Sequence, residues 1–349
     1  MKKLLLLLCL ILIPALTASD TSTYVLAVSG QDAGCSASYG TELNTDSNAI
    51  EPDASDTDAT TGWTSSGTTA FESISTESPH IGTYHFHATA DGPADRFYKN
   101  LADYSLSAGS IYKLSYHAKH SGSGADWWVG LNYASAAQEH DRVVITSTDS
   151  TYTQHSSLFI YNTEWDYFVA RANGASEIYV DNFTVKAATL CYGTELYTGD
   201  AGATAEENDV SNWTGSNIDT LESTSSGTPQ AGTYHIHINE NTTPTSSAYA
   251  YVDIGTAFSL VDDTKYFIRL YIKHVGTGGA WSVGLSNTAS STASPFYNYF
   301  SDSMTTYKEY GFSFVYSSSY RYLVAREANA SNDGGVYIDG ISIKEITAE

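Results

Sequence analysis

Short segments of this chain alternate apolar and polar residues with a period of two, which is the pattern of strands that bury one face. Residues 112–120 and residues 266–274 are two examples. Their inward positions are apolar in both segments: Tyr112, Leu114, Tyr116 and Ala118 in the first, and Tyr266, Ile268, Leu270 and Ile272 in the second. No window shows a sustained apolar repeat at the 3.6-residue spacing of a helix. The pattern predicts an all-β protein.

The sequence contains two copies of one module. Gly-Thr-Tyr-His-Phe-His at residues 82–87 returns as Gly-Thr-Tyr-His-Ile-His at residues 232–237, an offset of 232 − 82 = 150 residues. Each copy contains several short strands separated by turn residues, which is typical of a β-sandwich. We therefore expect two domains, at residues 35–187 and 188–349, joined by a short linker at residues 187–190. Four tryptophans that recur in matching strands are expected in the cores: Trp63, Trp127, Trp213 and Trp281.

The N-terminus has the features of an export signal. A basic Met-Lys-Lys start precedes an apolar run over residues 4–16, which is too short for a comfortable membrane span. This predicts a secretory signal peptide at residues 1–19 and a secreted protein, extracellular or at the cell surface, with no membrane insertion. Residues 20–34 then form a leader with one predicted strand. That strand either completes its own first module or inserts into a neighbouring subunit.

The charge of the chain argues against one class of ligand, and its cysteines predict a disulfide. The chain of 349 residues has 39 acidic and 16 basic side chains, a formal net charge of −23. Such a surface repels phosphate backbones, so nucleic-acid binding is not expected. Removal of the signal peptide with Cys9 leaves Cys35 and Cys191, and in an exported protein two such cysteines favour a disulfide. Two free buried thiols are the alternative.

Five motifs follow one another in the same order in both halves. They are a Gly-Thr-Glu-Leu opening, an early Trp, a Gly-x-Tyr strand, the segment at 112–119 with its counterpart at 266–273, and a closing strand at 179–185 or 337–343. With these motifs the module resembles the jelly-roll carbohydrate-binding modules of the galactose-binding-like superfamily, the type appended to cellulases and xylanases. The resemblance implies two tandem jelly-roll β-sandwich domains. The phenylalanine that usually follows the family's opening motif is absent from both copies.

The resemblance also implies a structural Ca²⁺ near the first and last strands of a module. Asp181 and Asp339 match the acidic position of the closing strand, and Glu42 and Glu195 are their candidate companions. The alternative is that these acids cap turns or pair with an arginine. No other cofactor is expected.

Glycan binding needs aromatic planes that stack on sugar rings and polar groups that bond sugar hydroxyls. Trp128 is predicted to point away from the core and is the best aromatic candidate. An outward stripe of polar side chains offers hydrogen bonds: His85, His87, His117 and Lys119 in the first copy, and His235, His237, Arg269, Tyr271 and Lys273 in the second. The alternative is that these are ordinary surface residues of a sheet.

Two further features stay open at the level of sequence. His85 and His87 share one side of a strand and could hold Zn²⁺ or Cu²⁺ if His117 supplied a third ligand. Arg171 and Arg326 occupy equivalent positions in the two copies. If their side of the strand is the core, each needs a carboxylate partner; if it is not, each joins the binding face.

No nucleophile motif, phosphate-binding loop, HExxH or heme signature occurs, and the two repeats leave no room for a catalytic domain. We therefore expect a non-enzymatic, secreted glycan-binding protein whose partner is a polysaccharide or other glycan. The alternative is a structural subunit of an extracellular filament, appendage or surface layer. Such a subunit would associate with itself into a polymer, joined by donation of the N-terminal strand.

Overall fold

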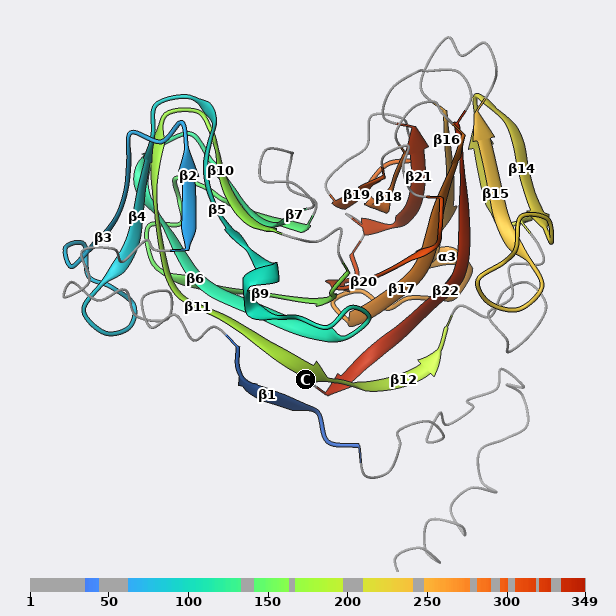
Figure 1. Ribbon diagram of the computed structural model, residues 1–349, viewed down its shortest axis with the longest axis horizontal. Helices are drawn as coiled ribbons and strands as arrows, with labels where there is room; N and C mark the ends of the chain where they lie inside the picture. The colour runs from blue at the N-terminus through green and yellow to red at the C-terminus, as the bar shows by residue number, and fades with distance from the viewer. Residues whose placement is uncertain are drawn as a thin grey trace, which may run out of the picture. The chain divides into compact units, whose positions relative to one another are not determined.

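The computed structural model describes residues 35–43, 62–132, 141–162, 167–196, 210–240, 248–276, 281–289, 296–300, 305–317, 320–327 and 334–348. Within these residues nearly all regular structure is antiparallel β-strand (Figure 1). The exceptions are a short 3₁₀-helix, η2 (Leu101–Tyr104), and a short α-helix, α3 (Ile254–Phe258). The all-β prediction is confirmed.

One long sheet contains strands from both copies of the repeat. In the first copy its order is β3 (Ala70–Ile74), β4 (His85–Ala90), β11 (Ser176–Thr189), β6 (Ile111–Gly124) and β9 (Thr153–Ile160), with β1 (Ser38–Glu42) also paired to β11. In the second copy the equivalent order is β14 (Ile218–Thr224), β15 (His235–Glu240), β22 (Gly334–Ala348), β17 (Lys265–Gly276) and β20 (Lys308–Val315), with β12 (Cys191–Glu195) also paired to β22.

Each copy adds a five-stranded sheet of its own. The first has the order β2 (Trp63–Ser66), β5 (Pro93–Asn100), β10 (Tyr167–Asn173), β7 (Trp127–Asn132) and β8 (Asp141–Ile145). The second has the equivalent order β13 (Trp213–Ser216), β16 (Tyr249–Asp253), β21 (Tyr322–Glu327), β18 (Trp281–Ser286) and β19 (Phe296–Phe300). The sequence pattern missed β5 and β16, because it predicts a loop after residues 82–87.

The core lies between the two sheets of each copy, as the sandwich prediction requires. Trp63 on β2 shows this directly. Its ring lies 5.0 Å from the ring of Phe86 on β4 and 5.2 Å from that of Phe183 on β11, so it joins the short sheet to the long one. The four tryptophans expected in the cores are all buried, with exposed fractions of 0–8%. The Trp63–Phe183 contact is edge to face, a geometry that stabilises a core beyond the area it buries.

The two halves of the long sheet meet at β9 and β20, where Phe159 lies opposite Phe312. The predicted linker at residues 187–190 is wrong. Strand β11 continues to Thr189, and Leu190 is buried in an apolar cluster with Leu158, Ile160 and Phe267. Leu190 is the only residue between the end of β11 at Thr189 and the start of β12 at Cys191, so the two copies are joined almost directly.

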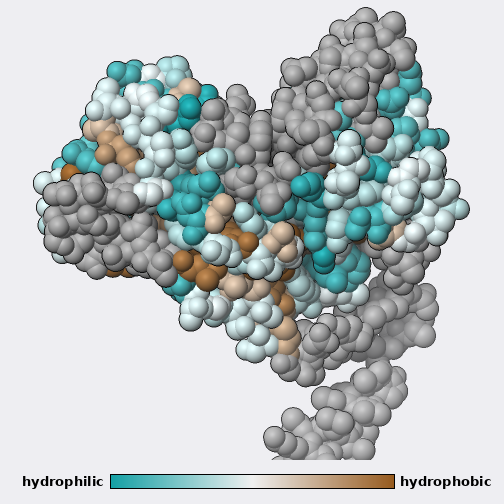
Figure 2. Space-filling model, in the orientation of Figure 1, coloured by the Kyte–Doolittle hydropathy of each residue, from teal (hydrophilic) through white to brown (hydrophobic). Residues whose placement is uncertain are grey.

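Other sequence predictions concern the termini and the surface. The signal peptide at residues 1–19 and the leader at residues 20–34 lie outside the described residues. Cys35 and Cys191 are both disulfide-bonded, which is the oxidised state favoured by the sequence. No helix among the described residues is long and apolar enough to cross a membrane. On the side drawn in Figure 2, hydrophilic residues predominate and hydrophobic residues form small patches among them.

Candidate functional site

The residues predicted to bind a ligand lie on two different sheets. Trp128 lies on β7 of the first five-stranded sheet, whereas His85, His87, His117 and Lys119 lie on β4 and β6 of the long sheet. Those sheets are the opposite layers of one sandwich, so the structure does not bring Trp128 together with the histidine stripe. Each side of the sandwich is therefore considered separately.

Strand β10 decides which side chains share the outer side of the short sheet with Trp128. Phe168, Ala170 and Ala172 belong to the hydrophobic core, and because strand side chains alternate, Tyr167 and Arg171 point the other way. The open question about Arg171 is thereby answered: it lies outside the core.

Cross-strand registers arrange the outer residues in rows. Arg171 lies directly opposite Arg96 on β5 and directly opposite Trp128 on β7. Tyr167 lies opposite Asn132. Directly opposite residues of antiparallel strands share one face. We call this surface the Trp128 face, and it consists of Arg96, Tyr98, Trp128, Asn132, Tyr167 and Arg171.

Contacts within the Trp128 face hold its aromatic and cationic groups in place. The Arg171 guanidinium lies 5.4 Å from the centre of the Trp128 ring, within the range of a cation–π interaction. The rings of Tyr98 and Tyr167 meet edge to face at 5.6 Å. Trp128, Tyr98 and Tyr167 are all half-buried. The face thus presents three aromatic rings that are partly exposed and fixed by their neighbours.

The second copy repeats this arrangement with substitutions. Its outer face, the Tyr249 face, consists of Tyr249, Tyr251, Ser282, Ser286, Tyr322 and Arg326. The rings of Tyr251 and Tyr322 again meet edge to face, at 5.5 Å. Arg326 is the counterpart of Arg171. On one side it lies opposite Ser282, which replaces Trp128 of the first copy. On the other side it lies opposite Tyr249, which replaces Arg96. Each arginine therefore has an aromatic neighbour, on β7 in the first copy and on β16 in the second.

Sequence reasoning missed Arg96, Tyr98, Tyr249 and Tyr251, because it missed their strands. A signal was present: Tyr249 and Tyr251 alternate with Ala250 and Val252, which are buried in the core. Strand β5 gives a weaker signal, because Phe97 is the only residue of the strand in the core cluster.

The histidines on the long sheet form a network beneath the loop that precedes β4. His85 is 0% exposed, and its Nδ1 lies 2.7 Å from the hydroxyl of Tyr152. Burial, followed by the charges of Lys119 and His87, lowers the pKa of His85 to about 4. The prediction that His85 points away from the core is right, but the side chain is covered rather than exposed.

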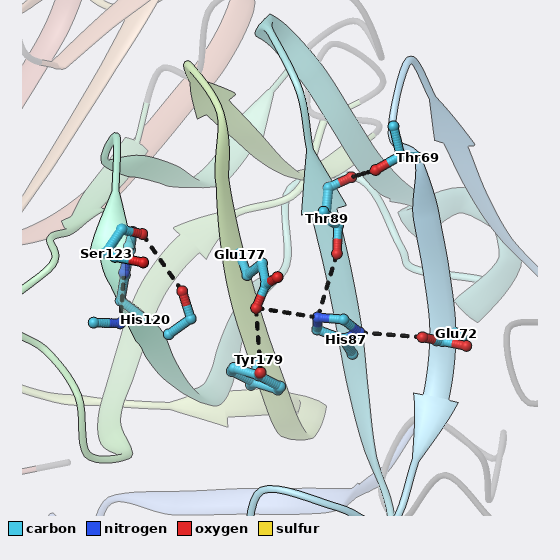
Figure 3. Close-up of polar contacts among 10 residues, drawn as sticks. Thr69, Glu72, His87, Thr89, His120, Ser123, Glu177 and Tyr179 are labelled. Carbon is cyan, nitrogen blue, oxygen red and sulfur yellow. Dashed lines mark hydrogen bonds and ion pairs between the residues drawn. The ribbon is translucent and has the colours of Figure 1, made fainter.

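His87 is held between two carboxylates (Figure 3). Its Nδ1 lies 3.2 Å from Oε1 of Glu72, and its Nε2 lies 3.7 Å from Oε2 of Glu177. The ring stacks on Tyr179 with the centroids 4.9 Å apart. His117 stacks on His80 at 3.7 Å, and burial lowers the pKa of His117. Among the described residues no three His, Cys, Asp or Glu side chains are grouped to hold a metal, so the suggested triad with His85 and His87 is wrong.

Lys119 and Asp181 attach the loop to this network. The Lys119 ammonium donates to the backbone carbonyl of Glu77 and lies 4.8 Å from the Tyr152 ring. Oδ2 of Asp181 accepts hydrogen bonds from the backbone N–H groups of His80 and Ile81, at 2.7 and 3.0 Å. These contacts fix residues 77–81 to the sheet.

The second copy keeps most of this network. Nδ1 of His235 lies 2.6 Å from the hydroxyl of Tyr307, and His237 lies 3.3 Å from Glu222. Lys273 donates to the carbonyl of Gly227, and Asp339 accepts from the N–H of Ala231 at 3.1 Å. Repetition of these contacts indicates a structural role, in which histidines, lysines and aspartates hold a loop to its sheet.

Arg269 and Tyr271 are separate from that network. Arg269 forms an ion pair with Glu309 and donates from Nη2 to the hydroxyl of Tyr271 at 3.1 Å. Arg269 also lines a cavity of about 120 Å³ at the junction of the two copies, together with Ile160 and Phe267.

The four acids predicted as calcium ligands accept hydrogen bonds from the protein. Oε1 of Glu42 accepts from the backbone N–H of Val185 at 2.7 Å, and Oε1 of Glu195 accepts from that of Ile343 at 2.7 Å. Asp181 and Asp339 accept from the loop N–H groups described above. The glutamates therefore serve closing strands, and the aspartates serve loops. Calcium binding stays a prediction.

Comparisons with known proteins give structural likeness only. No protein-family model matches the chain, and no curated protein matches it. Solved structures similar to this chain include the CBM22-1–CBM22-2 tandem domain of Xyn10C from Paenibacillus barcinonensis, with 12% identity over 90% of this chain and 99% of that one, at a TM-score of 0.33.

Single modules are also similar. The C-terminal family 22 carbohydrate-binding module of Clostridium thermocellum Xyn10B has 13% identity over 43% of this chain and 92% of that one, at a TM-score of 0.33. CBM27-1 of Caldicellulosiruptor saccharolyticus, solved with mannohexaose, has 12% identity over 40% of this chain and 92% of that one, at 0.27. All three of these structures are carbohydrate-binding modules. At such TM-scores the structural similarity gives no information about the ligand of this protein.

Proposed function

We propose that this protein binds polysaccharide chains without chemical conversion, through the Trp128 face and the Tyr249 face. The observation that carries the proposal is the repeated row of an arginine beside a half-buried aromatic ring. Trp128 accompanies Arg171 in the first copy, and Tyr249 accompanies Arg326 in the second. Aromatic rings supply flat apolar contact for sugar C–H groups, and guanidinium groups donate hydrogen bonds to sugar hydroxyls.

The strands make these faces suitable for an extended ligand. Rows of side chains on neighbouring strands lie about 4.8 Å apart, so a face of several strands spans more than one sugar unit. The long-sheet histidines suit this role less well, because loop contacts already cover or bind them. Export to the outside of the cell, predicted from the signal peptide, would place the two faces where polysaccharides occur.

The test is direct binding of neutral β-1,4-linked hexasaccharides of xylose, mannose and glucose, measured by calorimetry. Trp128→Ala and Tyr249→Ala should each weaken binding at the altered face by about tenfold or more, and the double variant should lose binding at both faces. His87→Ala, a change on the long sheet, serves as the matched control and should leave affinity unchanged. The proposal fails if no hexasaccharide and no acidic glycan binds, or if His87→Ala abolishes binding while both aromatic variants retain it.

A further inference from the structure

Two arginines face each other across neighbouring strands of the Trp128 face. Arg96 on β5 lies directly opposite Arg171 on β10. Like charges in directly opposite positions of an antiparallel pair destabilise the sheet. The repulsion between Arg96 and Arg171 therefore destabilises the fold unless a negatively charged group offsets it.

Neither arginine has a carboxylate partner among the described residues. Nη1 of Arg96 donates to the carbonyl of Ala94 on its own strand, at 3.1 Å, and the buried Nε of Arg96 has no hydrogen bond. Arg171 lies over Trp128, and both its Nε and its Nη1 are buried without a hydrogen-bond partner. Leaving charged donors unsatisfied in a partly desolvated position is unfavourable. Both side chains are half-buried, so each charge is held close to the protein surface.

A shortage of acids does not explain the missing partners, because the chain has 39 acidic against 16 basic residues. Several other cations of the described structure do have carboxylate partners. Lys99 lies 3.0 Å from Asp103, and Arg321 donates from Nε to Asp253 at 2.8 Å. Arg96 and Arg171 thus form a local positive site on a protein with a net charge of −23.

The Tyr249 face differs from the Trp128 face at the position of Arg96. Tyr249 stands where the first copy has Arg96, so Arg326 has no second arginine opposite it. The shared pair of tyrosines, Tyr251 and Tyr322, keeps the same geometry as Tyr98 and Tyr167. The cationic pair is therefore a property of the first copy and not of the fold.

We propose that the Trp128 face selects acidic polysaccharides, whose hexuronate carboxylate lies against Arg96 and Arg171 while the adjoining sugar ring stacks on Trp128. This inference rests on the proposed function. Guanidinium groups match planar carboxylates with paired hydrogen bonds, and such charge-assisted bonds are stronger than bonds between neutral groups. The carboxylate also relieves the repulsion between the two arginines. The Tyr249 face, with one arginine, takes neutral sugar units.

The experiment compares ligands that differ only in the carboxylate. One pair is oligogalacturonate and its methyl ester, and a second is a xylooligosaccharide with and without a glucuronate branch. We expect the acidic member of at least one pair to bind about tenfold more tightly at low salt. This preference should weaken as ionic strength rises, because exposed charges are screened.

Arg96→Gln should lower affinity for the acidic member more than affinity for the neutral member, so that the preference for the acidic member is lost. Arg96→Lys should retain part of the preference. Lys186→Gln removes one positive charge from the long sheet and is the matched control, for which we expect no change. The melting temperature of each variant establishes that it is folded.

The outcomes separate this inference from the proposed function. If neutral hexasaccharides bind but neither pair shows a preference for the acidic member, the inference is overturned and glycan binding stands. If dextran sulfate binds as tightly as the acidic member and Arg96→Gln weakens both equally, the site recognises anions in general and the uronate assignment is overturned. If no neutral or acidic glycan binds, the proposed function itself is wrong.

Discussion

Acidification should destabilise this protein through its buried histidines, and His85 allows the effect to be worked out. The folded environment lowers the pKa of His85 from 6.5 to about 4, chiefly by burial and then by the charges of Lys119 and His87. Protonation would also place an N–H on both ring nitrogens, and Nε2 is buried without a hydrogen-bond partner. The neutral ring is therefore the form that the folded state accepts.

The sign of the effect follows from the direction of this shift. The unfolded chain takes up a proton on His85 as the pH falls below about 6.5, whereas the folded chain does so only near pH 4. Stability is therefore complete above pH 6.5 and is lost progressively as the pH falls toward 4. Between about pH 7 and about pH 5, the loss from His85 alone amounts to about 2 kcal/mol, taken as an upper limit.

The assay is urea unfolding at about pH 7 and about pH 5, in the wild-type protein and in His85→Gln. The variant should be less stable at neutral pH, because the Tyr152 hydroxyl loses the bond to Nδ1 of His85. It should also lose about 2 kcal/mol less than the wild type on acidification. His87→Gln is the control, because His87 already lies beside Glu72 and Glu177. Equal losses in wild type and His85→Gln would show that His85 does not carry the pH dependence of stability.

Two further predictions concern bonds outside the binding faces. Reduction of the protein, or the double substitution Cys35→Ser with Cys191→Ser, should lower the free energy of unfolding by about 2–5 kcal/mol, because a bridge between these cysteines closes a long loop. Thermal or urea unfolding measures this loss. Recovery of two free thiols by non-reducing peptide mapping would contradict the pairing. Chelation with EDTA should leave the melting temperature unchanged, because Glu42, Asp181, Glu195 and Asp339 already accept hydrogen bonds from the protein. A fall in melting temperature that calcium restores would instead support the site implied by the family resemblance.

Strand periodicity was enough to predict the sandwich, because most strands bury one face and expose the other. It failed for β5, where a proline, an aspartate and several polar residues surround the buried Phe97. It also left the direction of Arg171 open. Strand β10 is apolar on both sides, since Val169 is buried outside the main core cluster while Phe168 and Ala170 are buried within it. The strand therefore does not show from its own residues which side meets the other sheet.

Burial of the histidines depended on contacts that no local pattern contains. The hydroxyl that bonds His85 comes from Tyr152, 67 positions along the chain, and the loop N–H groups that bond Asp181 come from residues about 100 positions earlier. A period of two shows which side of the strand carries His85. It does not show that a loop returns to cover that side, so a side chain that points outward in sequence terms becomes fully buried.

The two copies act as an internal control for separating structural from ligand-binding residues. Contacts that secure loops to the long sheet occur in both copies, with His85 and His235 bonded to Tyr152 and Tyr307 at nearly the same distance. Packing and loop closure demand the same solution each time, so these residues are constrained by stability. The outer faces keep the tyrosine pairs but differ at the row through Arg171. The row through Arg171 lies outside the hydrophobic core, so a change there leaves the core packing in place, as the proposed binding faces with different ligands require.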